Sequence, residues 1–125
     1  MIADTTFVSD LLKEQRTAQA GAASRFLLEH RTQKIRTSII TAGELAVLFP
    51  NSAAAWQFLD RWEIYRLHAG VVDAAADIDR ELLRKGRRLG ENDNWIAGFA
   101  RYYREPVISR DKAYDHAPGV RRVSY

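Results

Sequence analysis

The segment Gly90-Glu-Asn-Asp-Asn-Trp-Ile-Ala-Gly-Phe-Ala100 lies between a long amphipathic pattern and a short apolar run at 106–109. Gly90 is expected to end the earlier helix, because glycine adopts the left-handed conformation that closes helices without steric cost. Asn92 is then placed to cap the next helix, and Asp93 falls in its first turn, where a negative charge suits the helix dipole. Apolar residues recur from Asp93 onward with helical spacing, so this acid lies at the rim of the inward face.

Length and composition indicate one compact domain spanning residues 1–125. The 125 residues are 46% hydrophobic, enough to form a core. No run approaches the roughly 18 apolar residues of a membrane span, and residues 1–4 show no signal-peptide pattern. The absence of cysteine excludes disulfides and thiolate metal sites. These features lead us to expect a cytoplasmic protein with no membrane partner.

The charge is unevenly distributed. The formal net charge is +3, and residues 84–125 carry ten Lys and Arg against five Asp and Glu. A basic C-terminal third is compatible with a polyanionic partner such as nucleic acid. Solvated helix faces would explain the same charges.

Short apolar runs alternate with helical patterns along the whole chain. Strands are expected at 1–3, 35–40, 64–67 (a weak pattern), 106–109 and 120–124. Helices are expected to include 7–12, 20–30, 41–49, 52–62 and 71–82, with a polar loop at 15–19. Such alternation is typical of an α/β fold, a three-layer sandwich in which helices flank a mostly parallel central sheet.

Four acids, Asp4, Glu44, Asp93 and Asp111, follow a predicted strand or begin a predicted helix. Each has a local structural explanation. Asp4 and Asp111 could be turn or N-cap residues, and Asp93 could favour a helix dipole. Glu44 stands three residues after Thr41, the spacing of a capping box.

Taken together, the four acids indicate a cation site. The carboxyl ends of strands in an open α/β sheet share one edge, where ligands bind. Four carboxylates gathered there would raise one another's pKa values unless cations lay among them. Oxygen ligands favour Mg²⁺ or Mn²⁺ over zinc. The three histidines, His30, His68 and His116, are far apart in sequence and are expected to be surface or packing residues.

Five motifs, in order and correctly spaced, give the chain its resemblance to a known family. They are Ile2-Ala-Asp-Thr5, Ser38-Ile-Ile-Thr-Ala-Gly-Glu-Leu45, Gly86-Arg-Arg-Leu-Gly-Glu-Asn-Asp-Asn-Trp-Ile-Ala97, Val107-Ile-Ser-Arg-Asp111 and Pro118-Gly-Val120. With them the chain resembles a PIN domain, and most of all the VapC-type ribonuclease toxins of type II toxin–antitoxin pairs. The motifs span the whole chain, so the resemblance implies a single PIN domain.

The resemblance implies metal-ligand roles for the four acids and supporting roles for Thr5, Thr6 and Ser109. It implies a Mg²⁺- or Mn²⁺-dependent endoribonuclease that leaves a 5′-phosphate and a 3′-hydroxyl. It also implies a homodimer and silencing by a cognate antitoxin protein. The family usually has Asn where Thr6 stands. Threonine keeps a side-chain oxygen but lacks the amide, so the hydrogen bonds available to this side chain beside Asp4 differ here.

Basic residues near the acids are candidates to hold RNA phosphates, which position a substrate without specifying its sequence. The group at 84–88 would also be favoured as an exposed helix C-terminus. The candidates are Arg84, Lys85, Arg87, Arg88, Arg110 and Lys112.

The predicted helix near residue 56 is rich in large apolar side chains. Trp56, Leu59 and Trp62 share one face, while Phe58 lies on another. These residues could be core, but a helix that is apolar on more than one face also indicates a covered surface.

Two other functions fit the same acids. A binding module could hold a structural cation and cleave nothing, particularly with Thr6 in the site. A phosphoesterase could act on small molecules at a similar acidic edge. RNA cleavage with and without Mn²⁺ distinguishes the first, and a small phosphomonoester substrate distinguishes the second.

Overall fold

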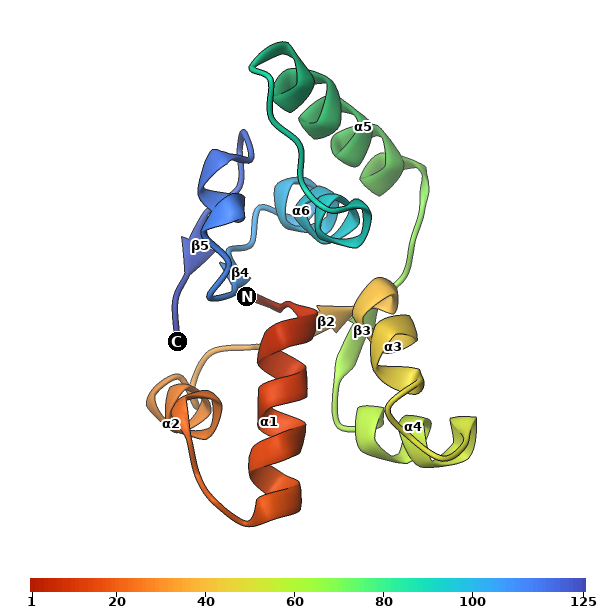
Figure 1. Ribbon diagram of the computed structural model, residues 1–125, viewed down its shortest axis with the longest axis vertical. Coiled ribbons are helices and arrows are strands. Elements are labelled where there is room, and N and C mark those ends of the chain that lie inside the picture. Colours follow the sequence, from red (N-terminus) through yellow and green to blue (C-terminus); the bar gives the residue numbers. More distant parts are fainter.

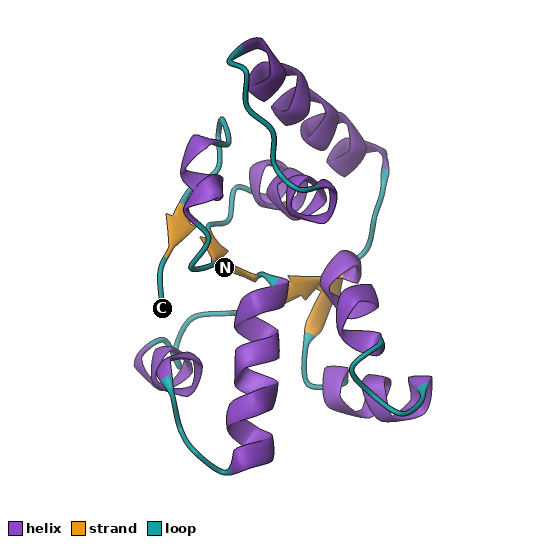
Figure 2. Ribbon diagram, in the orientation of Figure 1, coloured by secondary structure: helices purple, strands orange, loops and turns teal.

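Five short strands form a wholly parallel sheet in the order β3-β2-β1-β4-β5 (Figures 1 and 2). The computed structural model describes residues 1–125. The sheet confirms the predicted α/β class, although each strand is two or three residues long. The strands are β1 (Ile2–Ala3), β2 (Arg36–Ser38), β3 (Glu63–Tyr65), β4 (Val107–Ile108) and β5 (Arg122–Val123).

Helices cover both faces of the sheet. In Figure 1, α1, α2 and α4 lie below the sheet, whereas α5 and α6 lie above it. None of the helices combines the length and hydrophobicity needed to cross a lipid bilayer. The helices are α1 (Thr5–Thr17), α2 (Ala22–Glu29), α3 (Ile39–Ala46), α4 (Ser52–Leu59), α5 (Ala69–Arg84), α6 (Glu91–Tyr103) and the 3₁₀ helix η1 (Lys112–His116).

The sheet separates two hydrophobic clusters. Successive strand side chains point to opposite faces. Ile2 and Val107 accordingly join the cluster under α5 and α6, whereas Ala3 and Ile108 join the cluster around α1 and α2. Burial on both faces fixes the strand register, and the register in turn fixes where the segments after β1 and β4 emerge.

α5 and α6 pack closely because Gly98 has no side chain. A Cβ at this position would lie 2.7 Å from the Ala75 Cβ and 3.0 Å from the Val71 carbonyl oxygen. The predicted helix at 71–82 lies within α5, whose buried stripe is formed by Val71, Ala75, Ile78 and Leu82. This contact packs the middle of α6 closely against α5.

The boundary between α5 and α6 differs from the prediction. Gly86, with φ of +67°, is the left-handed residue beyond the end of α5, whereas Gly90 has φ of −56° and is the N-cap of α6. The predicted N-cap, Asn92, lies instead inside the first turn. Helical periodicity does not distinguish two nearby glycines, so the sequence placed this boundary four residues too late.

One other local prediction was wrong in detail. The predicted loop at 15–19 begins only after Thr17, because Ala18 takes the left-handed conformation there. In α4, Asn51 accepts the capping hydrogen bond. Trp56 is 52% exposed, whereas Phe58 is buried.

Candidate active site

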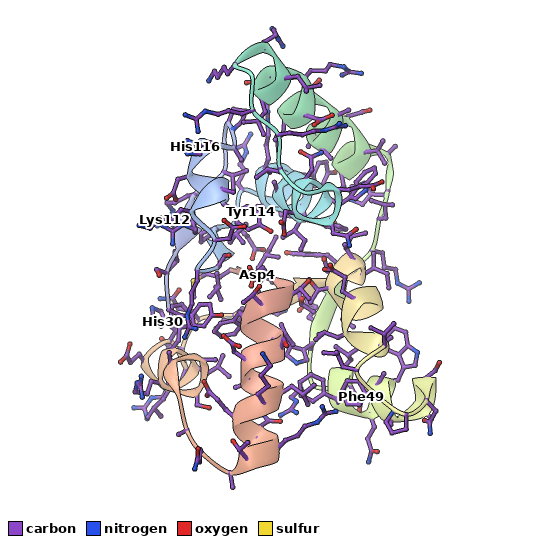
Figure 3. All side chains as sticks on the ribbon, viewed as in Figure 1. Asp4, His30, Phe49, Lys112, Tyr114 and His116 are labelled. Atoms are coloured by element: carbon purple, nitrogen blue, oxygen red, sulfur yellow. The ribbon has the colours of Figure 1, made fainter.

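The carboxyl edge of the sheet brings the strand ends together. Ala3 pairs in register with Ile108, and the Asp4 amide donates a hydrogen bond to the Ile108 carbonyl at 3.2 Å. Asp4 and Ser109 therefore emerge side by side from β1 and β4. Figure 3 shows Asp4 at the top of α1, close to the centre of the molecule.

Asp4 caps α1 and is almost fully buried. Its Oδ1 accepts a hydrogen bond from the Phe7 amide at 2.7 Å, and the residue is 3% exposed. The N-cap function that sequence suggested is therefore present. That hydrogen bond occupies Oδ1, and a carboxylate has several further acceptor positions on its two oxygens.

The surroundings of Asp4 oppose its ionisation. Burial raises its pKa to about 6, and the charges of Asp93 and Asp111 add to the rise. Hydrogen bonds from the Ser109 hydroxyl and the Phe7 amide act in the opposite direction but do not cancel it. A bound cation would remove this repulsion.

Glu44 is held by residues remote in sequence. Its carboxylate accepts hydrogen bonds from the Thr5 hydroxyl and from the Asn92 amide nitrogen, the latter at 2.9 Å. The predicted capping box with Thr41 is absent, because Ser38 is the N-cap of α3 and accepts from the Thr41 amide. Glu44 therefore lies beyond the first turn, where no free backbone N–H remains for it.

Asp93 lies where α6 meets η1. Its Oδ1 accepts a hydrogen bond from the Tyr114 hydroxyl at 3.0 Å. Burial raises the pKa of Asp93, the charges of Asp111 and Glu44 raise it further, and the Tyr114 hydrogen bond lowers it. Burial also raises the pKa of Tyr114, together with the charges of Asp93, Asp4 and Asp111, so the phenol remains a donor at neutral pH.

Asp111 caps η1 at the exposed rim. Its Oδ1 accepts from the Ala113 amide at 2.8 Å, and its own amide donates to the Ser109 hydroxyl at 2.9 Å. The cap function expected from sequence is thus present here too. Ser109 contacts both neighbouring acids and is itself fully buried.

No cationic side chain pairs with any of these four acids. None of the ten ion pairs of the structure includes Asp4, Glu44, Asp93 or Asp111. Arg110, adjacent to Asp111 in sequence, instead pairs with Asp10 and lies over the Tyr125 ring. The acids thus form an anionic region at one edge of the sheet that no ion pair neutralises. The charge of Arg122, which pairs with Asp115, also interacts with that of Asp111.

The donor set suits a hard divalent cation, although its oxygens are not gathered into a coordination shell. No three His, Asp or Glu side chains lie close enough together to hold a metal ion. The acids still interact electrostatically. Burial is the main cause of the raised pKa values of Asp4 and Asp93, and the charges of neighbouring acids add to both. Binding of a cation would therefore require the carboxylate side chains, that of Glu44 in particular, to turn toward one another. Asp4, Glu44, Asp93 and Asp111 are the residues that could hold Mg²⁺ or Mn²⁺.

The three histidines contribute nothing to this site. His30 stacks on Phe26 with ring centroids 3.9 Å apart. His68 caps α5 through the Gly70 amide, and His116 is exposed in η1. They are surface and packing residues, as predicted.

The predicted supporting hydroxyls behave differently from one another. Thr5 and Ser109 contact the acids, whereas Thr6 is exposed and makes no side-chain hydrogen bond. Among the basic candidates, Arg88 pairs with Asp79 at 3.4 Å. All six basic side chains are exposed. The group at 84–88 lies at the end of α5 and in the connection between α5 and α6. Figure 3 shows Lys112 on the outer side of η1.

Two residues of the site were missed by sequence reasoning. Asn92 was predicted to be a cap but donates a hydrogen bond to Glu44, and Tyr114 was given no role. No local signal pointed to Tyr114, because its partner Asp93 lies 21 positions away in the sequence.

Comparison with known proteins agrees with this architecture. Residues 1–120 match the family model of the PIN domain. The chain belongs to the PIN domain family. No match to this PIN protein was found among curated protein sequences.

Solved structures share the fold of this PIN protein. One is the structure of VapBC2 from Rickettsia felis bound to a DNA fragment from the VapBC2 promoter. A chain of that structure has a TM-score of 0.82 and 20% sequence identity, covering 99% of this chain and 97% of that chain. A chain of FitAcB from Neisseria gonorrhoeae has a TM-score of 0.79 and 21% sequence identity, covering 97% of this chain and 94% of that chain. A chain of VapBC-5 from Mycobacterium tuberculosis, a member of the VapBC family of toxin-antitoxin systems, has a TM-score of 0.62 and 25% sequence identity, covering 73% of this chain and 82% of that chain. The predicted PIN-like fold is confirmed.

Proposed function

We propose that this PIN protein is a metal-dependent endoribonuclease and the toxin of a toxin–antitoxin pair. The carrying observation is the set of four carboxylates at the carboxyl edge of the sheet, none of which has a cationic partner. Membership of the PIN family and the likeness to VapBC structures support the same function. The RNA it cleaves and the antitoxin that silences it are expected to meet it in the cytoplasm.

The four acids would hold Mg²⁺ or Mn²⁺. When bound, the cation would activate water, neutralise the scissile phosphate and stabilise the departing 3′ oxygen. Asp93 would accept the proton of the attacking water, because burial and its neighbours raise its pKa above that of an ordinary aspartate. The Asp4–Phe7 hydrogen bond would keep the Asp4 carboxylate at the edge of the sheet, while Glu44 would turn from its present contact with Thr5.

Exposed cations would position the RNA. The basic group at 84–88 precedes α6, the helix that carries Asp93, and Arg110 precedes Asp111. Phosphate contacts from these residues would orient the backbone without reading bases. Removing one should weaken binding of all RNA sequences alike and reduce its salt dependence.

Protein partners would cover the apolar surface. Trp56 and Leu67, exposed by 52% and 44%, contribute to a groove of about 680 Å³ that is also lined by Ile39, Trp62 and Ile64. Exposed apolar grooves mark interaction sites. We assign this groove to the antitoxin or to a second copy of the chain, in keeping with the VapBC complexes that share the fold.

Cleavage of single-stranded RNA, with Mn²⁺ and with excess EDTA, tests the proposed function. We expect cleavage only with the metal and its loss in Asp93→Asn. Glu91→Gln is the matched control, because Glu91 is an exposed acid in the same turn of α6. Full activity in EDTA would contradict metal dependence. Metal binding without cleavage would support the binding module, and hydrolysis of a phosphomonoester alone would support the small-molecule phosphoesterase.

A further inference from the structure

Tyr114 places a hydroxyl group in the interior beside Asp93. The residue is fully buried, and its ring belongs to the hydrophobic cluster beneath α5 and α6. The hydroxyl has one hydrogen bond, to Asp93 Oδ1 at 3.0 Å. Figure 3 shows Tyr114 on η1, above Asp4 in the view.

Packing alone does not account for this hydroxyl. A phenylalanine ring would fill the same space, and burying a hydroxyl is unfavourable unless it is hydrogen-bonded. Because Asp93 is the single partner, the hydroxyl acts on that carboxylate and on nothing else.

One oxygen of the Asp93 carboxylate is held by a hydrogen bond. Oδ1 accepts from Tyr114, whereas Oδ2 has no hydrogen-bond donor in the structure. Gly90 leaves space beside Oδ2, where a Cβ would be 3.2 Å away. The Tyr114 hydroxyl therefore holds the carboxylate at one oxygen and leaves the other available.

η1 also joins Asp93 to Asp111. Asp111 caps this helix through the Ala113 amide, and Tyr114 follows one 3₁₀ turn later. The Tyr114 amide donates to the Asp111 carbonyl. The same segment therefore carries Asp111 at the edge of the sheet and the hydroxyl that holds Asp93. The position of η1 thus sets the position of one acid relative to the other.

We propose that Tyr114 is a positioning residue whose hydroxyl fixes the Asp93 carboxylate for binding a divalent cation. This inference rests on the proposed function of the four acids. Hydrogen-bonding partners that orient metal ligands typically change metal affinity by about 10- to 100-fold when removed.

Tyr114→Phe tests the inference, because it removes only the hydroxyl. Mn²⁺ affinity is measured by calorimetry below the melting temperature of every variant, and kcat and KM are measured on RNA with saturating Mn²⁺. We expect affinity to fall by about tenfold and kcat to fall, with KM for RNA unchanged.

Tyr65→Phe is the matched control. The Tyr65 hydroxyl also donates to a carboxylate, that of Glu105, which precedes β4 at the opposite edge of the sheet. This variant should lose thermal stability to a similar extent but keep wild-type Mn²⁺ affinity and kcat.

The outcomes separate this inference from the function on which it rests. Wild-type protein that binds no Mn²⁺ and cleaves no RNA would overturn the proposed function. Wild-type binding with equal affinity in Tyr114→Phe would overturn the positioning role alone. Equal losses of affinity in Tyr114→Phe and Tyr65→Phe would also overturn it, because the effect would then be general destabilisation.

Discussion

The carboxylates at the two edges of the sheet differ in whether they are paired with basic groups. At the amino edge, Glu105 contacts the Met1 ammonium at 2.8 Å and Arg36 at 2.9 Å, and it accepts a hydrogen bond from Tyr65. Glu63 pairs with Arg36 and Lys34. At the carboxyl edge, none of the four acids forms an ion pair with a basic side chain.

The pKa values record the difference. Burial opposes ionisation of Glu105, but hydrogen bonds from the Met1 ammonium and Tyr65, with the charge of Arg36, hold its pKa below the ordinary value. Hydrogen bonds from Lys34 and Arg36 lower the pKa of Glu63. Asp4 and Asp93 are shifted upward instead. The amino edge is thus electrostatically satisfied, whereas the carboxyl edge retains repulsion that a ligand can relieve, as is common at functional sites.

The largest expected contrast is in turnover. Glu44→Gln should reduce RNA cleavage and metal affinity roughly 100-fold or more, because it removes a charge that the cation requires. The melting temperature should stay near that of wild type, since glutamine can still accept a hydrogen bond from Thr5 or Asn92. Wild-type cleavage by Glu44→Gln would remove Glu44 from the site.

A second contrast lies in the pH dependence of metal-free stability. The pKa of Asp4 rises from 3.8 to about 6 on folding, a shift equivalent to about 3 kcal/mol. Because the folded-state pKa is raised, this stability is complete below about pH 4 and is lost as pH rises toward and past 6.

The comparison of wild type with Asp4→Asn isolates this effect, since asparagine keeps the cap on Phe7 but does not ionise. Relative to Asp4→Asn, wild type should lose stability across that pH range in chemical unfolding. Excess Mg²⁺ should reduce the loss, because a cation held by the four acids would bind only the folded state. A difference that does not change with pH would show that Asp4 is not destabilised at this edge.

At the amino edge, ionisation of a carboxylate stabilises the folded protein instead of destabilising it. Glu105→Gln should lower the free energy of unfolding by about 2 kcal/mol, less than for a fully buried pair because the side chain is 18% exposed. The pKa of Glu105 is lowered on folding, so its contribution is present at neutral pH and is lost as pH falls. Urea unfolding measures the change. Glu63→Gln, at a more exposed carboxylate, should cost less, and an equal cost would contradict this ranking.

The smallest expected effect is at Gly90. A Cβ would press on Asp93 Oδ2, so Gly90→Ala should weaken Mn²⁺ binding several-fold while changing stability by less than about 1 kcal/mol. Gly43→Ala is the control, because a Cβ there meets nothing within 4 Å inside α3. It should stabilise the protein by about 0.5–1 kcal/mol and leave calorimetric affinity unchanged. Equal affinity in both variants would show that Gly90 does not shape the site.

The sequence by itself determined the order of strands and helices, the parallel sheet and the acids at its carboxyl edge. These features depend on periodicity and on residues that follow a strand or begin a helix, and both are local. The caps made by Asp4 and Asp111 were foreseeable for the same reason, since each contact spans two or three residues.

Only the tertiary structure decided what surrounds those acids. Glu44 meets Thr5 and Asn92 across 39 and 48 positions of sequence, and Tyr114 meets Asp93 across 21. Such contacts depend on how α3, α6 and η1 pack on the sheet, which no local pattern encodes. The absence of ion pairs with these acids is likewise a property of the whole fold, because Arg110 could have paired with its neighbour Asp111 but is held by Asp10 of α1 instead.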